Sequence, residues 1–152
     1  MTFDRLEPVA VGDLTFDVRT LGPGDGEPVM LLHGFPETSL SWSAVAPMLA
    51  DAGFHVVAPD QRGYSPDARP ASVAGYAMEH LVADVLGIGA AVERGRFHLV
   101  GHDWGASVGW VLAAHHPDRL RTFTRSRYPT SPPTTPPCAA TPTSSNAPRT
   151  SR

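Results

Sequence analysis

One carboxylate stands between two glycines in the stretch Gly101-His102-Asp103-Trp104-Gly105. An apolar run precedes this stretch and an apolar helical pattern follows it, which predicts a strand, a sharp turn and a helix. A side chain at the apex of such a turn has a strained backbone, which requires small residues two positions before and after it. A carboxylate at the apex acts as a nucleophile by forming an ester. The spacing therefore predicts attack by Asp103 on an sp³ carbon. The alternative is a polar turn whose Asp caps the following helix.

Strand-like and helix-like patterns alternate along the chain that must position this turn. Predicted strands cover residues 14–21, 28–33, 54–60, 96–101 and 120–124, and predicted helices cover 38–52, 76–92 and 106–116. This alternation implies right-handed crossovers and an α/β fold with a mostly parallel sheet between helices. Chemistry in such a sheet lies at the carboxyl ends of the strands. His33, Asp60 and Asp103 are all predicted at such ends.

The composition indicates one folded domain and excludes several classes of partner. The 152 residues carry a net charge of -3, all twelve cations are Arg, and Cys138 is the single cysteine. The charge gives no general attraction to nucleic acid or anionic membranes. The N-terminal residues lack the pattern of a signal peptide, and no apolar stretch has the length of a membrane span. We expect a cytoplasmic protein with no nucleic-acid or membrane partner, no metal and no other cofactor; the oligomeric state stays open.

Four motifs in this order resemble the α/β-hydrolase superfamily, in its epoxide hydrolase and haloalkane dehalogenase branch. They are His33-Gly34-Phe35-Pro36-Glu37, Asp60-Gln61-Arg62-Gly63-Tyr64, Gly101-His102-Asp103-Trp104-Gly105 and His116-Pro117-Asp118-Arg119-Leu120. The resemblance covers roughly residues 14–124 and implies the N-terminal part of an α/β-hydrolase fold. Each motif alone has little specificity, and the order of the four together carries the resemblance.

The resemblance also implies roles for particular residues. Asp103 would be the nucleophile of a nucleophile elbow, and the backbone N–H groups of Phe35 and Trp104 would form the oxyanion hole. Hydrolysis of the ester passes through an oxyanion, which such donors stabilise by roughly 3 kcal/mol each. A cis Phe35–Pro36 bond would aim the Phe35 amide, since X–Pro bonds adopt cis at low cost. Residues that support the turn and the loop would be His33, Gly34, Pro36, Gly101, His102 and Gly105.

Two positions favour the epoxide hydrolases within this branch. Haloalkane dehalogenases usually have Asn where this chain has Phe35, and fluoroacetate-type dehalogenases usually have Arg where it has Trp104. The implied substrate is a small hydrophobic epoxide or a related alkyl compound. A haloalkane or haloacid dehalogenase remains an alternative, as does a binding or interaction module without catalysis.

The last part of the chain has a different composition. Residues 125–152 contain no Leu, Ile, Val, Phe, Met, Trp, Asp or Glu, which predicts a disordered tail after a partial core domain over residues 1–124. Apart from Tyr128 and Asn146, every tail residue is Pro, Thr, Ala, Ser, Arg or Cys, types whose codons have C or G in second position. We interpret the tail as a frameshift product of a GC-rich gene. A native Pro-rich tail with polyproline ligands is the competing interpretation.

The remaining candidates have structural roles in this interpretation. Asp60 is expected to brace Arg62 or the loop, and His33 and His102 are expected to brace their own turns. The family resemblance implies a cap, a catalytic His and an acid beyond the motifs found here. We therefore expect a truncated epoxide hydrolase-like chain that has the nucleophile and does not turn over.

Overall fold

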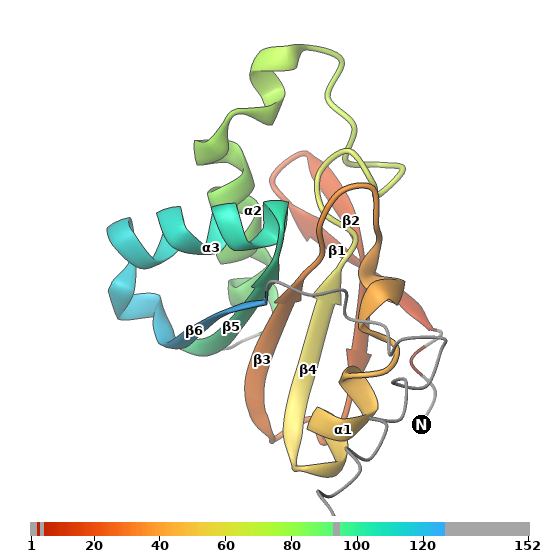
Figure 1. Ribbon diagram of the computed structural model, residues 1–152. Helices are drawn as coiled ribbons and strands as arrows, with labels where there is room; N and C mark the ends of the chain where they lie inside the picture. Colours follow the sequence, from red (N-terminus) through yellow and green to blue (C-terminus); the bar gives the residue numbers. More distant parts are fainter. Residues whose placement is uncertain (1–2, 4, 93–94, 127–152) are drawn as a thin grey trace, which may run out of the picture.

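A six-stranded mixed sheet forms the centre of the molecule (Figure 1). The computed structural model describes residues 3, 5–92 and 95–126. The strands lie in the order β1-β2-β4-β3-β5-β6. Their bounds are Leu6–Val11 (β1), Leu14–Leu21 (β2), Glu27–Leu32 (β3), Phe54–Pro59 (β4), Phe97–His102 (β5) and Leu120–Ser126 (β6).

The strands β4, β3, β5 and β6 run parallel, as the alternation of strands and helices predicts. The strands β1 and β2 add an antiparallel hairpin at one side of the sheet. The sequence predicts no strand before Leu14, and Pro8 obscures β1 because proline is tolerated in a strand mainly at an edge. The carboxyl ends of β3, β4 and β5 consequently meet at one end of the sheet, from which the loops that carry the motifs emerge.

Three α-helices and three short 3₁₀ helices connect the strands. Their bounds are Ser39–Trp42 (η1), Ala46–Asp51 (α1), Val73–Tyr76 (η2), Met78–Ala91 (α2), Trp104–His115 (α3) and Pro117–Arg119 (η3). The predicted single helix over residues 38–52 is wrong, because the structure has η1, a turn and then α1. Pro47 has no N–H to donate to the Ser43 carbonyl, and its ring would clash with that group in a continuous helix.

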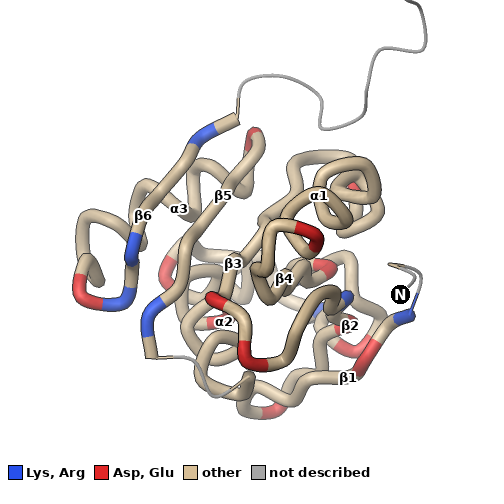
Figure 2. Tube along the Cα trace, turned by 90° about the horizontal axis from the view of Figure 1, so that it is seen from below, with Lys and Arg blue, Asp and Glu red and all other residues tan. Residues whose placement is uncertain are grey.

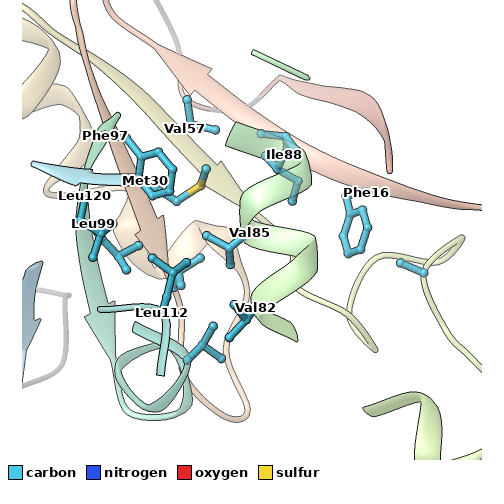
Figure 3. Packing of buried hydrophobic residues seen from close by; sticks show 14 residues of the cluster. Phe16, Met30, Val57, Val82, Val85, Ile88, Phe97, Leu99, Leu112 and Leu120 are labelled. Atoms are coloured by element: carbon cyan, nitrogen blue, oxygen red, sulfur yellow. The ribbon is translucent and has the colours of Figure 1, made fainter. Parts of the chain in front are cut away.

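Helices cover both faces of the sheet, and each face has its own apolar core (Figure 1). Alternate residues of β3 point to opposite faces. Val29 and Leu31 pack with Ala46 of α1, whereas Met30 and Leu32 belong to the larger core under α2 and α3. Figure 3 shows this larger core, with side chains of α2 and α3 against those of the sheet. The two cores hold the ends of β3 and β5 in fixed positions under the site.

Gly87 explains how α2 can lie close to the N-terminal hairpin. A Cβ at this position would overlap the side chain of Val11 at the end of β1. Glycine in a helix interior costs about 1 kcal/mol relative to alanine, but here it permits direct contact between helix and strand. The helix predicted over residues 76–92 thus forms as α2 in spite of its glycines.

The strand β6 ends two residues beyond the predicted boundary at Thr124. Arg125 pairs with Gly101 and Ser126 with His102, so both residues continue the parallel ladder with β5. The rest of the predicted tail, residues 127–152, lies outside the described residues. Figure 2 shows basic residues along β6 and the turn before it, where Arg119, Arg121 and Arg125 are found. Charges on an outer strand disfavour pairing with other sheets.

Candidate active site

The turn between β5 and α3 has a strained backbone at its apex. Asp103 has φ 50° and ψ -115°, and it is the single non-glycine residue with positive φ in the described part of the chain. A Cβ on Gly101 would lie 2.5 Å from the carbonyl oxygen of Gly105, and a Cβ on Gly105 would overlap the carbonyl of Leu32. Both positions therefore require glycine, and the turn has the geometry that the Gly-x-Asp-x-Gly spacing predicts.

Main-chain amides surround the Asp103 carboxylate. The N–H of Phe35 donates to Oδ2 with 3.1 Å between nitrogen and oxygen, and the N–H of Trp104 also donates to this carboxylate. These two hydrogen bonds, the one from Phe35 first, lower the pKa of Asp103 below its ordinary value of 3.8, and the nearby His102 ring lowers it slightly further. Asp103 is therefore ionised at neutral pH, as a carboxylate nucleophile must be.

The loop after β3 brings the Phe35 amide to this carboxylate. The Phe35–Pro36 peptide bond is cis, which confirms the expectation from the sequence. A Cβ on Gly34 would lie 2.6 Å from the Cβ of Asp103, so a larger residue there would push the loop away. The structure thus places Phe35, Trp104 and the Asp103 carboxylate together, as the family resemblance implies.

His33 and His102 bond to the loops beside the site. His33 is fully buried, its Nδ1 lies 2.9 Å from the carbonyl oxygen of Gly34, and its Nε2 accepts the N–H of Gln61 at 3.0 Å. A carbonyl can only accept and an amide N–H can only donate, so the ring is neutral with its proton on Nδ1. Burial lowers the pKa of His33, which keeps this form. The Nδ1 of His102 lies 3.2 Å from Oε2 of Glu37 in the loop after β3.

The Asp60 carboxylate bonds to the loop after β3 and does not bond to Arg62. Its Oδ1 accepts hydrogen bonds from the N–H of Ser39 at 2.7 Å and from the Ser39 hydroxyl at 2.6 Å. The expected contact of Asp60 with Arg62 is wrong, and its partner is Ser39 in the loop after β3. The Arg62 side chain instead points to α2, where it meets Asp84.

The pair of Arg62 and Asp84 is a feature that the sequence interpretation missed. The guanidinium donates two hydrogen bonds to the carboxylate, at 2.6 and 2.7 Å, and both side chains are at most 10% exposed. Asp84 lies in the helical stripe of Leu81, Val85 and Ile88, among positions that face the core. An acidic residue within an apolar stripe was the signal for a buried cation elsewhere in the fold.

An apolar cleft of about 230 Å³ opens beside the Phe35 and Trp104 amides. The side chains of Phe35 and Trp104 are 69% and 57% exposed. The other lining residues include His33, Gly34, Gln61, Arg62, Tyr64, Tyr76, Leu81 and Val108. A second, more polar cleft includes Asp103 itself and is lined by His102, Ala106, Ser107, Trp110, Arg125 and Ser126. Asp103 is exposed and can be reached by a small molecule.

Residues 3, 5–92 and 95–126 have no feature of a metal site or of a membrane-spanning helix. No group of three or more His, Cys, Asp or Glu side chains in that part could hold a metal ion. No helix there has the length and apolar character needed to cross a bilayer.

Comparison with known families decides the relationship of the chain. Residues 27–136, well over half of the sequence, match the family described as alpha/beta hydrolase fold. The chain belongs to the α/β-hydrolase fold family. Among its relatives, Epoxide hydrolase A of Mycobacterium tuberculosis is 44% identical over 117 residues, which cover 76% of this chain and 36% of that protein. Epoxide hydrolase 3 of Siraitia grosvenorii is 36% identical over 120 residues, covering 79% and 38%.

Solved α/β-hydrolase structures agree with this relationship. Epoxide Hydrolase A from Mycobacterium thermoresistibile has a TM-score of 0.77 at 36% identity, over 80% of this chain and 38% of that protein. An epoxide hydrolase from Vigna radiata has a TM-score of 0.76 at 36% identity, over 80% and 39%. These relatives confirm the resemblance to the epoxide hydrolase branch. The chain spans less than two fifths of the length of each of these four proteins.

Proposed function

We propose that Asp103 opens an epoxide ring and becomes a hydroxyalkyl ester. The observation that carries this proposal is an ionised, exposed carboxylate, held by two main-chain amides next to an apolar cleft. An oxygen of the carboxylate forms a bond to a ring carbon, and the bond between that carbon and the ring oxygen breaks. The ring oxygen leaves as an alkoxide and takes a proton from water, which reaches the exposed site. The epoxide hydrolases among the relatives support this choice of substrate.

The apolar cleft supports epoxides that carry an aromatic or alkyl group. Phe35, Tyr64 and Trp104 line it together with Leu81 and Val108. Burying an apolar group gains about 25 cal/mol for each Å² removed from water. A phenyl or alkyl substituent in the cleft would hold the ring carbon near Asp103, and styrene oxide is a suitable probe.

We also propose that this chain retains the ester longer than an enzyme with a water-activating base beside the ester would. Release requires a base that activates water for attack on the ester carbonyl, with the Phe35 and Trp104 amides stabilising the oxyanion. The two histidines beside the site, His33 and His102, have ring nitrogens bonded to loop residues. In the described part of the chain, buried His33 offers this water no ring nitrogen because both are bonded, and the Nδ1 of His102 is held by Glu37.

Incubation with excess styrene oxide is expected to add the mass of one epoxide molecule to the chain. The reaction is stopped with acid, because alkyl esters are labile to base, and peptide mapping locates the added mass on Asp103. Chromatography measures the diol in the same samples, which should stay below one equivalent while the ester forms. Many equivalents of diol would contradict retention of the ester. If neither ester nor diol forms, the proposed nucleophile is wrong.

Ester formation is expected to have the same rate across neutral pH and to decline in acid with a midpoint below pH 3.8. The reactive form is the carboxylate, and the lowered pKa of Asp103 means that this form persists below the ordinary value of 3.8. In the described part of the chain, the charged and titratable groups around Asp103 include Tyr64, Arg125 and His102, which itself contacts Glu37. Rates of mass gain after brief exposure to each pH give the profile. An acid limb centred well above 3.8 would contradict the hydrogen bonding described here.

Circular dichroism at each pH provides the control for unfolding. The unfolded chain takes a proton on His33 as pH falls below 6.5, whereas the folded chain resists protonation because its pKa there is lowered. The unfolded state then binds more protons, so the stability contributed by neutral His33 is present above pH 6.5 and lost as the pH falls. Only samples whose circular dichroism spectrum is unchanged are included in the pH profile of ester formation.

A further inference from the structure

Gln61 donates hydrogen bonds to two parts of His33, the imidazole ring and the main-chain carbonyl. The N–H of Gln61 donates to Nε2 of His33 at 3.0 Å, and the Gln61 side-chain amide donates to the His33 carbonyl oxygen at 2.6 Å. His33 is completely buried, so these bonds act away from bulk water, where an unmade bond costs most. One residue of the loop after β4 thereby fixes His33, the residue that directly follows β3.

The His33 carbonyl links the two segments whose amides face Asp103. It accepts a second hydrogen bond from the N–H of Gly105, at 3.1 Å. Phe35 follows His33 by two residues, and Trp104 directly precedes Gly105. The Nδ1–H of His33 also donates to Gly34, which links the ring to the same loop. The relative position of the Phe35 and Trp104 amides therefore depends on how the His33 carbonyl is held.

We propose that Gln61 is a positioning residue that sets the distance between the Phe35 and Trp104 amides by acting through His33. The inference rests on the proposed function, because those amides are proposed to orient the nucleophile and to bind the oxyanion. The side-chain amide suits this task because it places a donor against a carbonyl. Glutamate at the same position would place a carboxylate oxygen there and repel the carbonyl.

The neighbouring residue explains why the Gln61 side chain stays in place. Arg62 forms the buried pair with Asp84 and also donates to the Gly75 carbonyl at 3.0 Å. These bonds fasten the loop after β4 to α2 and to the segment before it. Gln61 is thus presented to His33 from a fixed support.

The variants Gln61→Met and Gln61→Glu test the proposal, and Arg96→Met is the control. Methionine keeps the length of the side chain and removes the donor, and glutamate replaces the donor with an acceptor. Arg96 also bonds a carbonyl, that of Leu120 at 2.7 Å, but at the opposite end of β5. Arg96 donates to this carbonyl through two nitrogens, so Arg96→Met controls for the loss of side-chain bonds to the main chain without a link to His33.

The rate of ester formation at saturating styrene oxide should fall about tenfold in Gln61→Met, as a small displacement of reacting groups predicts. The fall should be larger in Gln61→Glu. The acid limb of the pH profile should move to higher pH, since the Phe35 amide then holds the Asp103 carboxylate less closely. Arg96→Met should change neither quantity. A wild-type rate and acid limb in Gln61→Met, or the same losses in Arg96→Met, would overturn the proposal.

Backbone NMR separates this proposal from the proposed function. If the wild-type chain forms no ester, the proposed function fails, and the amide resonances of Phe35 and Trp104 still report the geometry. In Gln61→Met these two resonances should shift, while that of Ala46 in α1 stays in place. Unchanged resonances of Phe35 and Trp104 would overturn the positioning role, whether or not the chain reacts with epoxides.

Discussion

Asp103→Asn is expected to lower ester formation by styrene oxide more than about 10³-fold, because removal of a nucleophile removes the reaction path itself. The asparagine side chain has nearly the same shape as aspartate, and its carbonyl oxygen can still accept the Phe35 N–H that now reaches Oδ2. The fold should therefore persist while the reaction is lost. Intact mass against time, with peptide mapping, measures the difference.

Asp118→Asn provides the matched control for this loss. Asp118 is an exposed carboxylate in η3, away from the loops that surround Asp103. The same chemical change there should leave the mass gain at its wild-type rate. Reaction of Asp103→Asn at the wild-type rate would place the ester on another carboxylate and remove the basis for the proposed function.

Asp84→Leu is expected to lower the free energy of unfolding by about 3–5 kcal/mol, because it leaves the Arg62 guanidinium buried without its anion. Both side chains of this pair are at most 10% exposed, so water can replace the lost partner only in part. The hydrogen bonds to Asp84 are the main reason that the pKa of Arg62 is raised, so the guanidinium remains charged in the wild-type fold. Urea denaturation followed by circular dichroism measures the change.

The double variant Arg62→Met with Asp84→Leu separates charge from packing. Removing both charges eliminates the uncompensated cation, so the double variant should regain at least half of the lost stability. It should remain below the wild type, since the bond from Arg62 to the Gly75 carbonyl is also lost. A single variant within about 1 kcal/mol of wild type would contradict the burial of this pair.

Features written in short stretches of sequence could be predicted. The glycines around Asp103, the cis bond before Pro36 and the order of strands and helices depend on local conformational limits and on periodicity. The broken helix also had a local signal, because Pro47 cannot continue a helix from Ser43. The prediction of one helix over residues 38–52 instead followed the helical spacing of apolar residues, which continues across Pro47.

Features that join distant segments could not be assigned in the same way. Asp60 and Asp84 are both acidic, and although the apolar stripe around Asp84 indicates a buried cation, it does not say which cation pairs with it. The fold decides, because Asp60 lies against Ser39 and Asp84 lies across from Arg62 on α2. The role of Gln61 depends likewise on the approach of the loop after β4 to the end of β3.

The donors that face Asp103 are main-chain N–H groups. In Phe35 and Trp104, the main chain and the side chain therefore have separate roles. The amides of Phe35 and Trp104 face the carboxylate, while their side chains are largely exposed beside the apolar cleft. Substitutions at these positions can redesign the shape of the cleft without replacing a donor. Glycine positions such as Gly34 have no such latitude, because their lack of a side chain is what lets the donors approach. Tolerance to mutation should therefore be higher at Phe35 and Trp104, whose side chains border the apolar cleft, than at Gly34, which has no side chain in the cleft.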